Sequence, residues 1–227
     1  MSLLDFLFPK YCVNCKKIGS YICDNCFSYI SFNENSICLV CNRASFDGKT
    51  HPPCRSRVTI DGAFSALEYK GIVKKIIYQF KYKPYLLDLK NVLVDFMYES
   101  LIQNEFFTKI PKEYAVLTPI PLHASKLRER GYNHAEILGQ ELGKKLRLPV
   151  INPLKRTKKT KSQFGLKRDE RKENLKSAFA VYLQKIEHPT VFLVDDILTT
   201  GSTLLEAAKA LKKAGVKQVW GITLARD

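Results

Sequence analysis

The chain has 227 residues, which fits one large domain or one domain with a small module, and 45% of them are hydrophobic, enough to bury a sizeable core. No stretch is long and apolar enough to span a bilayer, which argues against an integral membrane protein. The formal net charge of +15 at pH 7 is the charge expected of a protein with a polyanionic partner, although a lysine-rich proteome would give the same excess.

The N-terminus does not have the order of a secretory signal. Asp5, Pro9 and Lys10 interrupt the short apolar run at the start of the chain. A secretory signal places its positive charge before a longer apolar core. We therefore expect a cytoplasmic protein.

All seven cysteines lie in the first 54 residues, and their spacing predicts two zinc sites. A C-x-x-C turn directs two sulfurs to one point, so two such turns complete a tetrahedron around zinc. The fourth pair has the altered form His51-Pro-Pro-Cys54, in which the histidine replaces a thiolate or is a plain surface residue. The two predicted ligand sets are Cys12, Cys15, Cys23 and Cys26, then Cys38, Cys41, His51 and Cys54.

A disulfide framework is the alternative explanation of these cysteines. It needs an oxidising compartment, and nothing in the sequence directs export. A segment this small has little core, so metal binding would supply most of its folding energy. The confinement of the cysteines predicts a double zinc-ribbon module over residues 1–57 and a second domain over residues 58–227.

The second domain shows alternating helical and strand patterns. In chain order we expect helices over 72–80 and 86–101, a strand over 115–117, a helix over 135–147, a strand over 191–194, a helix over 204–214 and a last strand over 219–224. This alternation predicts an α/β fold with a mainly parallel sheet flanked by helices.

The strongest functional signal is the thirteen-residue run from Val191 to Thr203. A buried strand brings two adjacent carboxylates, Asp195 and Asp196, to its carboxyl end, where α/β sheets bind ligands. The next residues open a helix with small hydroxyl side chains and a glycine, which offer donors to a phosphate: Thr199, Thr200, Gly201, Ser202 and Thr203. Carboxylates accept hydrogen bonds from a diol, so the run predicts a ribose 5-phosphate site rather than an acidic helix cap.

This run resembles the phosphoribosyl-pyrophosphate (PRPP) binding motif of type I phosphoribosyltransferases at all thirteen positions. The resemblance implies that Asp195 and Asp196 hold the ribose hydroxyls and that residues 199–203 hold the 5-phosphate. It also implies a type I phosphoribosyltransferase fold for the second domain, with Mg²⁺ accompanying PRPP.

Two basic segments are further candidates for anion binding. Arg128 and Arg130 beside Gly131 offer cationic donors and close backbone approach to a pyrophosphate, although a solvated basic turn has the same composition. Residues 155–172 carry nine Lys or Arg against two acidic residues, so this loop either closes over a phosphorylated ligand or grips a nucleic-acid backbone. Its candidate contacts are Lys158, Lys159, Lys161, Gln163, Phe164, Arg168 and Arg171. Phe164 either stacks on a base or anchors the core.

The cysteine pairs, the stretch from Pro119 to His134, the basic loop and the PRPP motif occur in an order that resembles the ComF (ComFC-type) family of competence proteins over nearly the whole chain. That resemblance implies a double zinc ribbon before a phosphoribosyltransferase domain. It also implies handling of imported single-stranded DNA in the cytoplasm during transformation, with DNA-uptake channel or helicase proteins as partners and no membrane insertion.

Two functions therefore stay open at this point. The protein is either a DNA-handling protein that uses its PRPP site for ligand sensing or for a phosphorylated strand end, or an active phosphoribosyltransferase that transfers ribose 5-phosphate to a base. No residue stands out as a general base for an acceptor. Residues 58–110, the basic loop or the zinc module must supply the acceptor side.

Overall fold

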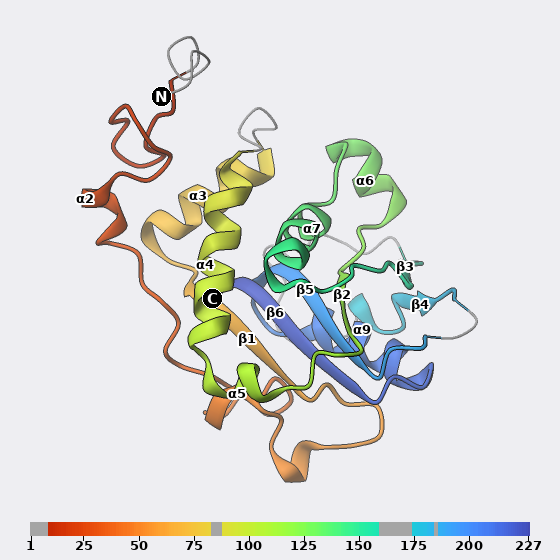
Figure 1. The fold of residues 1–227 in the computed structure, drawn as a ribbon. Helices are drawn as coiled ribbons and strands as arrows, with labels where there is room; N and C mark the ends of the chain where they lie inside the picture. Colours follow the sequence, from red (N-terminus) through yellow and green to blue (C-terminus); the bar gives the residue numbers. More distant parts are fainter. Residues whose placement is uncertain (1–8, 83–87, 159–173, 184–185) are drawn as a thin grey trace.

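The fold is described from a computed structural model, in which residues 9–82, 88–158, 174–183 and 186–227 are placed well enough to describe (Figure 1). The helices are α2 (Asp24–Phe27), α3 (Gly71–Tyr82), α4 (Leu89–Gln103), α5 (Glu105–Lys109), α6 (Ala124–Arg130), α7 (His134–Leu146) and α9 (Ser202–Lys213), with short 3-10 turns η1 (Phe46–Gly48) and η2 (Pro52–Cys54). The strands are β1 (Gly62–Glu68), β2 (Ala115–Pro119), β3 (Leu154–Arg156), β4 (Phe179–Val181), β5 (Thr190–Leu198) and β6 (Gln218–Arg226).

The central sheet is parallel throughout. Its strand order is β1-β6-β5-β2, and a separate antiparallel pair joins β3 to β4. Because all four strands run the same way, their carboxyl ends meet at one edge, which is where an open α/β sheet binds ligands. The expected α/β fold with a mainly parallel sheet flanked by helices is confirmed.

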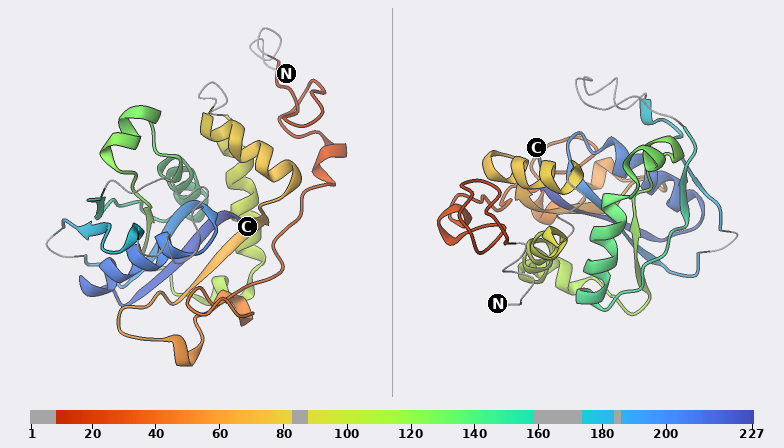
Figure 2. Two further views of the ribbon diagram at one scale, coloured as in Figure 1. Left: turned by 180° about the vertical axis from the view of Figure 1, so that it is seen from behind. Right: turned by 90° about the horizontal axis from the view of Figure 1, so that it is seen from above.

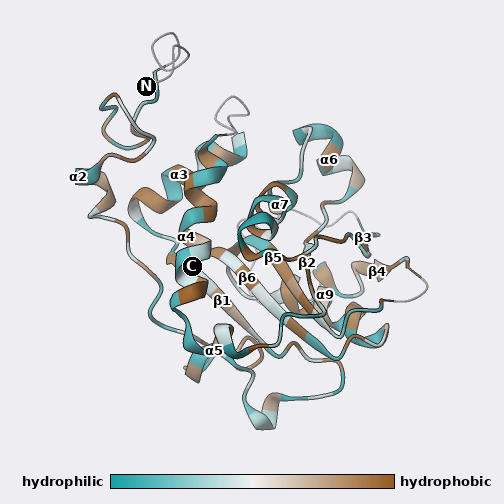
Figure 3. Ribbon diagram, in the orientation of Figure 1, coloured by the Kyte–Doolittle hydropathy of each residue, from teal (hydrophilic) through white to brown (hydrophobic). Residues whose placement is uncertain are grey.

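Helices cover both faces of the sheet, and the alternation of side chains along β5 shows why. Phe192 and Val194 point into the cluster formed with α4 and α7, whereas Val191 and Leu193 point into the cluster formed with α9. All four are fully buried. Apolar residues accordingly dominate the strands in Figure 3, and hydrophilic residues gather on the outward helix faces.

Strand β5 is longer than the sequence predicts. The expected strand ends at Val194, where pairing with β2 stops, but β6 continues to pair with β5 as far as Leu198. The acidic pair therefore lies in the part of β5 that pairs with β6 alone. Asp195 is opposite Thr223 in that strand. The sequence interpretation also missed β1 and assigned no helix to the segment before Gly131, which forms α6.

The first ribbon, which holds the cysteines from Cys12 to Cys26, packs against α3 and α4. Cys12, Val13 and Cys26 belong to the same buried cluster as the inner face of α3. Lys75 Nζ in α3 donates to Asn14 Oδ1 at 2.8 Å, and the Phe27 and Phe96 rings stack at 5.9 Å between centroids. Figure 2 shows this ribbon beside α3 in both views.

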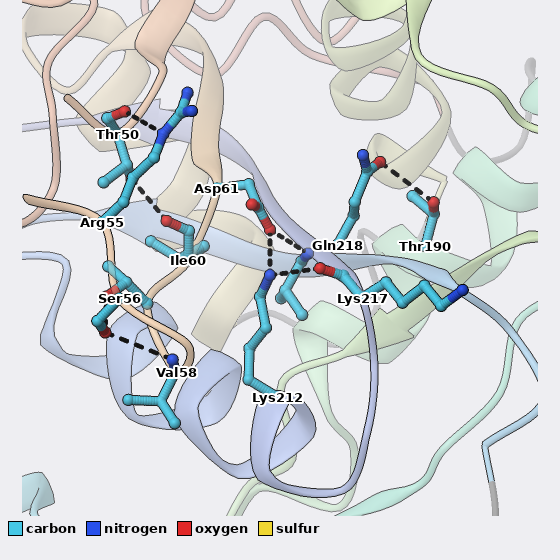
Figure 4. A network of polar contacts seen from close by, with 12 residues as sticks. Thr50, Arg55, Ser56, Val58, Ile60, Asp61, Thr190, Lys212, Lys217 and Gln218 are labelled. Atoms are coloured by element: carbon cyan, nitrogen blue, oxygen red, sulfur yellow. Dashed lines mark hydrogen bonds and ion pairs between the residues drawn. The ribbon is translucent and has the colours of Figure 1, made fainter. Parts of the chain in front are cut away.

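The segment that leaves the second ribbon is fixed to the amino-terminal end of the sheet (Figure 4). Thr50 Oγ1 donates to Ile60 O at 2.6 Å, and Arg55 Nε donates to Thr50 O at 3.1 Å. Asp61 accepts from the Val219 N–H and forms an ion pair with Lys212, each at 2.7 Å. The two parts of the chain therefore share hydrogen bonds as well as apolar contacts, and the domain boundary near residue 58 remains a prediction.

Within the described ranges, no helix has the length and hydropathy needed to cross a membrane.

Candidate functional site

The first four cysteines converge on one point. The sulfurs of Cys12, Cys15, Cys23 and Cys26 all lie within 4.8 Å of one another. Burial opposes ionisation of the Cys12 thiol, but backbone N–H groups, that of Cys15 first, outweigh it and lower its pKa to about 6. Four sulfurs at this spacing fit the tetrahedral site that zinc prefers.

The second set converges in the same way and includes His51. The sulfurs of Cys38, Cys41 and Cys54 and a ring nitrogen of His51 lie within 4.8 Å of one another. His51 Nδ1 is 3.3 Å from the Cys41 sulfur, and its Nε2–H donates to Ala44 O at 3.0 Å. That hydrogen bond holds the ring in the tautomer whose Nδ1 lone pair is available to a metal. Burial and the neighbouring sulfurs raise the pKa of Cys54 to about 11. A bound cation would stabilise the thiolate against both effects.

The acidic pair lies at the carboxyl end of β5 and is already engaged by a lysine. Lys81 Nζ, at the end of α3, is 2.8 Å from Asp196 Oδ2, and both side chains are less than one fifth exposed. Asp195 Oδ1 accepts from the backbone N–H of Asp196 at 2.9 Å. The two carboxylates thus have different partners, one a cation and the other a backbone amide.

These surroundings shift the pKa values of Asp195 and Lys81. Burial and the charge of Asp196 raise the pKa of Asp195 to about 7, against the opposing effects of the Asp196 N–H, Lys81 and Arg156. Burial lowers the pKa of Lys81, but the adjacent Asp196 raises it more, so the lysine stays charged. Asp195 therefore exchanges its proton in the neutral range, whereas Lys81 keeps its charge.

The loop after β5 has the geometry of an anion-binding turn. Gly201 stands immediately before the first residue of α9. It adopts a left-handed conformation with φ of 73°, which glycine tolerates. The Thr200 and Ser202 hydroxyls lie 2.9 Å apart. The first backbone N–H groups and the favourable dipole at the start of this twelve-residue helix suit a phosphate.

Leu39 connects the second zinc site to this loop. It stands between Cys38 and Cys41 in the sequence and is only 1% exposed. A Cβ atom placed on Gly201 would meet the Leu39 side chain at 3.4 to 3.5 Å. The second zinc site and the proposed phosphate loop are therefore packed together.

The predicted pyrophosphate residues lie on and after α6. Arg128 is exposed in the last turn of that helix, and Gly131 caps it with φ of 78°. The Arg130 guanidinium lies over the Tyr82 ring, 5.5 Å from its centroid. Their part in pyrophosphate binding stays a prediction.

The basic loop is described only at its edges. Lys158 is exposed and its Nζ donates to Lys176 O at 2.6 Å. Strands β3 and β4 pair on either side of it, with Leu154 opposite Val181. The other candidate residues of this loop lie outside the described residues: Lys159, Lys161, Gln163, Phe164, Arg168 and Arg171.

Three residues of the site were missed from the sequence. Lys81 continues the amphipathic pattern of α3 and gives no sign of its partner. Arg156 is 8% exposed, and its charge acts on Asp195. His134 is 2% exposed, and its Nε2–H donates to Lys81 O at 3.1 Å. Burial lowers the pKa of His134 to about 4, so this neutral ring holds the backbone of Lys81.

A cavity of about 390 Å³ opens at the carboxyl ends of β1 and β6. Burial raises the pKa of Tyr69, one of its lining residues. The lining residues are Asn33, Asn35, Glu68, Tyr69, Lys70, Lys74, Arg226 and Asp227.

Two families match separate parts of the chain. Residues 3–57 match the double zinc ribbon domain, and residues 128–227 match the phosphoribosyl transferase domain. The first match covers both cysteine sets, and the second covers β5, the acidic pair and the loop that opens α9.

Three curated relatives are similar to larger parts of the chain. Competence protein F of Haemophilus influenzae is 44% identical over 122 residues, which is 52% of this chain and 52% of that protein. The chain therefore spans about half the length of this relative. Competence protein ComFC of Bacillus subtilis is 28% identical over 91% of this chain and 84% of its own length. The DNA utilization protein YhgH of Escherichia coli K12 is 26% identical over 88% of this chain and 95% of its own length.

Proposed function

Since the chain belongs to the ComF family of competence proteins, with a double zinc ribbon and a phosphoribosyltransferase domain, we propose that it binds PRPP or a related ribose 5-phosphate ligand and handles single-stranded DNA in the cytoplasm. The observation that carries the proposal is the acidic pair at the carboxyl end of β5, followed directly by the left-handed Gly201 turn that opens α9.

The geometry supports a division of the ligand along this segment. Asp195 and Asp196 would accept hydrogen bonds from the ribose hydroxyls, and residues 199–203 would donate to the 5-phosphate. A diol needs an acceptor, so the affinity should rise as Asp195 loses its proton around its pKa of about 7. Mg²⁺ would accompany PRPP and neutralise part of the pyrophosphate charge, and Arg128 and Arg130 are the candidate pyrophosphate contacts.

Zinc has a structural part in this proposal. Both ligand sets are closed sets of four, which leaves no open position for a reacting group. The metal would keep the ribbons folded. Leu39 of the second ribbon would then pack against Gly201 and stabilise the phosphate loop.

Charge and family support the DNA part of the proposal. A net charge of +15 favours a polyanion, and the names of the relatives refer to competence and DNA utilization. The basic loop and the zinc ribbons would follow the phosphate backbone, and DNA-uptake channel or helicase proteins would be partners.

Two measurements test the two parts separately. Calorimetry with PRPP and Mg²⁺ should give binding to the wild type and none to Asp195→Ala/Asp196→Ala; equal binding by both proteins would contradict the site. Affinity for a single strand should fall steeply between low and high salt, and neutralising Lys158, Lys159 and Lys161 should make that fall shallower. Unchanged affinity in both comparisons would contradict the part assigned to the basic loop.

A phosphoribosyltransferase is the second candidate, and the cavity beside Tyr69 favours it. The cavity opens at the carboxyl ends of β1 and β6, on the same edge of the parallel sheet as the acidic pair, and offers amide, aromatic and cationic groups to an acceptor. Pyrophosphate release with one member of a panel of bases would support transfer. PRPP binding without release over the whole panel would favour ligand sensing.

A further inference from the structure

The solvent-facing side of α3 carries a lysine and two tyrosines in one row. Lys74, Tyr78 and Tyr82 follow one another at intervals of four residues, so they share one face of the helix. The opposite face packs into the core through Ile72, Val73, Ile76, Ile77 and Phe80. The row is thus not needed to hold the helix in place.

The two tyrosines form an aromatic pair that is open to solvent. Tyr78 is 60% exposed and Tyr82 is 54% exposed, yet their ring centroids are only 4.9 Å apart with an interplanar angle of 44°. Single exposed aromatic rings are common on protein surfaces and need no explanation. Two exposed rings in contact with each other have the form of a platform on which planar groups stack.

Cations stand at both ends of this pair. The Arg130 guanidinium lies 5.5 Å from the Tyr82 ring centroid, and its Nη2 is 3.5 Å from the Tyr82 hydroxyl. Lys74 Nζ lies 5.2 Å from the centroid of the Tyr69 ring. Aromatic rings and cations therefore lie together from Tyr69 to Arg130, the combination that serves bases and phosphates.

We propose that this α3 strip, defined as Tyr69, Lys74, Tyr78, Tyr82 and Arg130, is a stacking surface for single-stranded DNA. The inference rests on the proposed function and adds to it a surface on which the bases stack. Bases would stack on Tyr78 and Tyr82, while Lys74 and Arg130 would contact the phosphates. A single strand is the occupant because its bases are free to leave their own stack, whereas those of a duplex are paired inside it.

The strip would also direct the strand toward the ribose phosphate site. Tyr82 is the neighbour of Lys81, whose ammonium holds Asp196 at 2.8 Å. From Lys74 to Tyr82 the helix rises about 12 Å, the length of roughly two to four nucleotides. A DNA strand that runs along the strip from Lys74 to Tyr82 would therefore end beside the acidic pair.

The test compares fluorescence anisotropy of a labelled oligothymidine with the wild type and with Tyr78→Ser/Tyr82→Ser in the full-length protein. We expect the double variant to bind about tenfold more weakly or worse. The matched control is Tyr114→Ser/Tyr182→Ser, because these tyrosines are as exposed, 63% and 60%, but lie outside α3. The control should bind like the wild type. Calorimetry with ribose 5-phosphate should give the same affinity for all three proteins, which shows that the variants are folded.

An abasic oligomer of the same length separates stacking from charge. The wild type should prefer oligothymidine over the abasic strand by about tenfold or more, and the double variant should lose that preference. Lys74→Gln should instead weaken both oligomers alike and reduce the salt slope by about 0.7.

The outcomes separate the strip from the wider proposal. If the wild type binds oligothymidine and the double variant binds it equally well, the strip is wrong while the DNA function stands. If the control variant weakens binding as much as the double variant, the strip is also wrong. If the wild type binds no single strand, both the DNA function and the strip are wrong.

Discussion

Replacing Asp195 by asparagine should make the folded protein more stable at neutral and alkaline pH, although it removes a proposed ligand contact. Burial and the charge of Asp196 raise the pKa of Asp195 to about 7 from an ordinary 3.8. The folded state therefore holds one more proton than the unfolded state between these values, so stability declines as pH rises through this window. A shift of about three units corresponds to at most about 4 kcal/mol of destabilisation above pH 7. Asparagine avoids this cost and still accepts the Asp196 N–H.

Urea unfolding at about pH 5 and about pH 8 measures this effect. Asp195→Asn should gain about 2 to 4 kcal/mol over the wild type at the higher pH and much less at the lower. Asp95→Asn is the matched control, because Asp95 is 54% exposed, and it should show no such gain. Asp196→Asn should act in the opposite direction and cost about 3 kcal/mol, since it leaves the Lys81 ammonium without its carboxylate. A variant at 195 that is no more stable than the wild type at the higher pH would refute the reasoning.

Three further predictions concern the zinc module and its contact with the phosphate loop. Metal analysis should find two zinc ions per chain, and chelation should unfold residues 1–57; less than one zinc per native chain would contradict the assignment. His51→Ala should reduce the zinc content from two toward one while the first site stays filled, and full retention of both metals would mean that His51 is a surface residue. Leu39→Ala should cost about 2 to 4 kcal/mol in urea unfolding and weaken ribose 5-phosphate binding, because the side chain is buried against Gly201. Unchanged ligand affinity in that variant would show that the contact has no bearing on the phosphate loop.

The fold was largely predictable because its core elements have strong patterns. The helix around Ile72, the strand at Ala115 and the helix after Gly201 all follow from apolar periodicity and from turn residues. The missed strand β1 contains Gly62 and small residues such as Ser65, which carry no strong strand signal. It forms a strand because β6 provides its partner along the whole length, a contact distant in sequence.

The site was predictable where its residues are adjacent in sequence and not where the fold brings them together. The metal ligands form local patterns, so their spacing was sufficient to predict that they converge, whereas the role of the PRPP motif in ligand binding stays a prediction. Lys81 and His134 come from separate helices, and only the contact between the end of α3 and the start of α7 brings them together. The length of β5 also depends on β6, which pairs beyond the point where the apolar run ends.

The central claim is that a ribose phosphate lies across the segment from Asp195 to Thr203. A crystal structure of the protein with ribose 5-phosphate and Mg²⁺ tests it directly. We predict ribose hydroxyls within hydrogen-bond distance of Asp195 or Asp196, and the 5-phosphate on the backbone N–H groups of residues 199–203 at the start of α9. A ribose phosphate bound elsewhere, with this segment empty, would contradict the account.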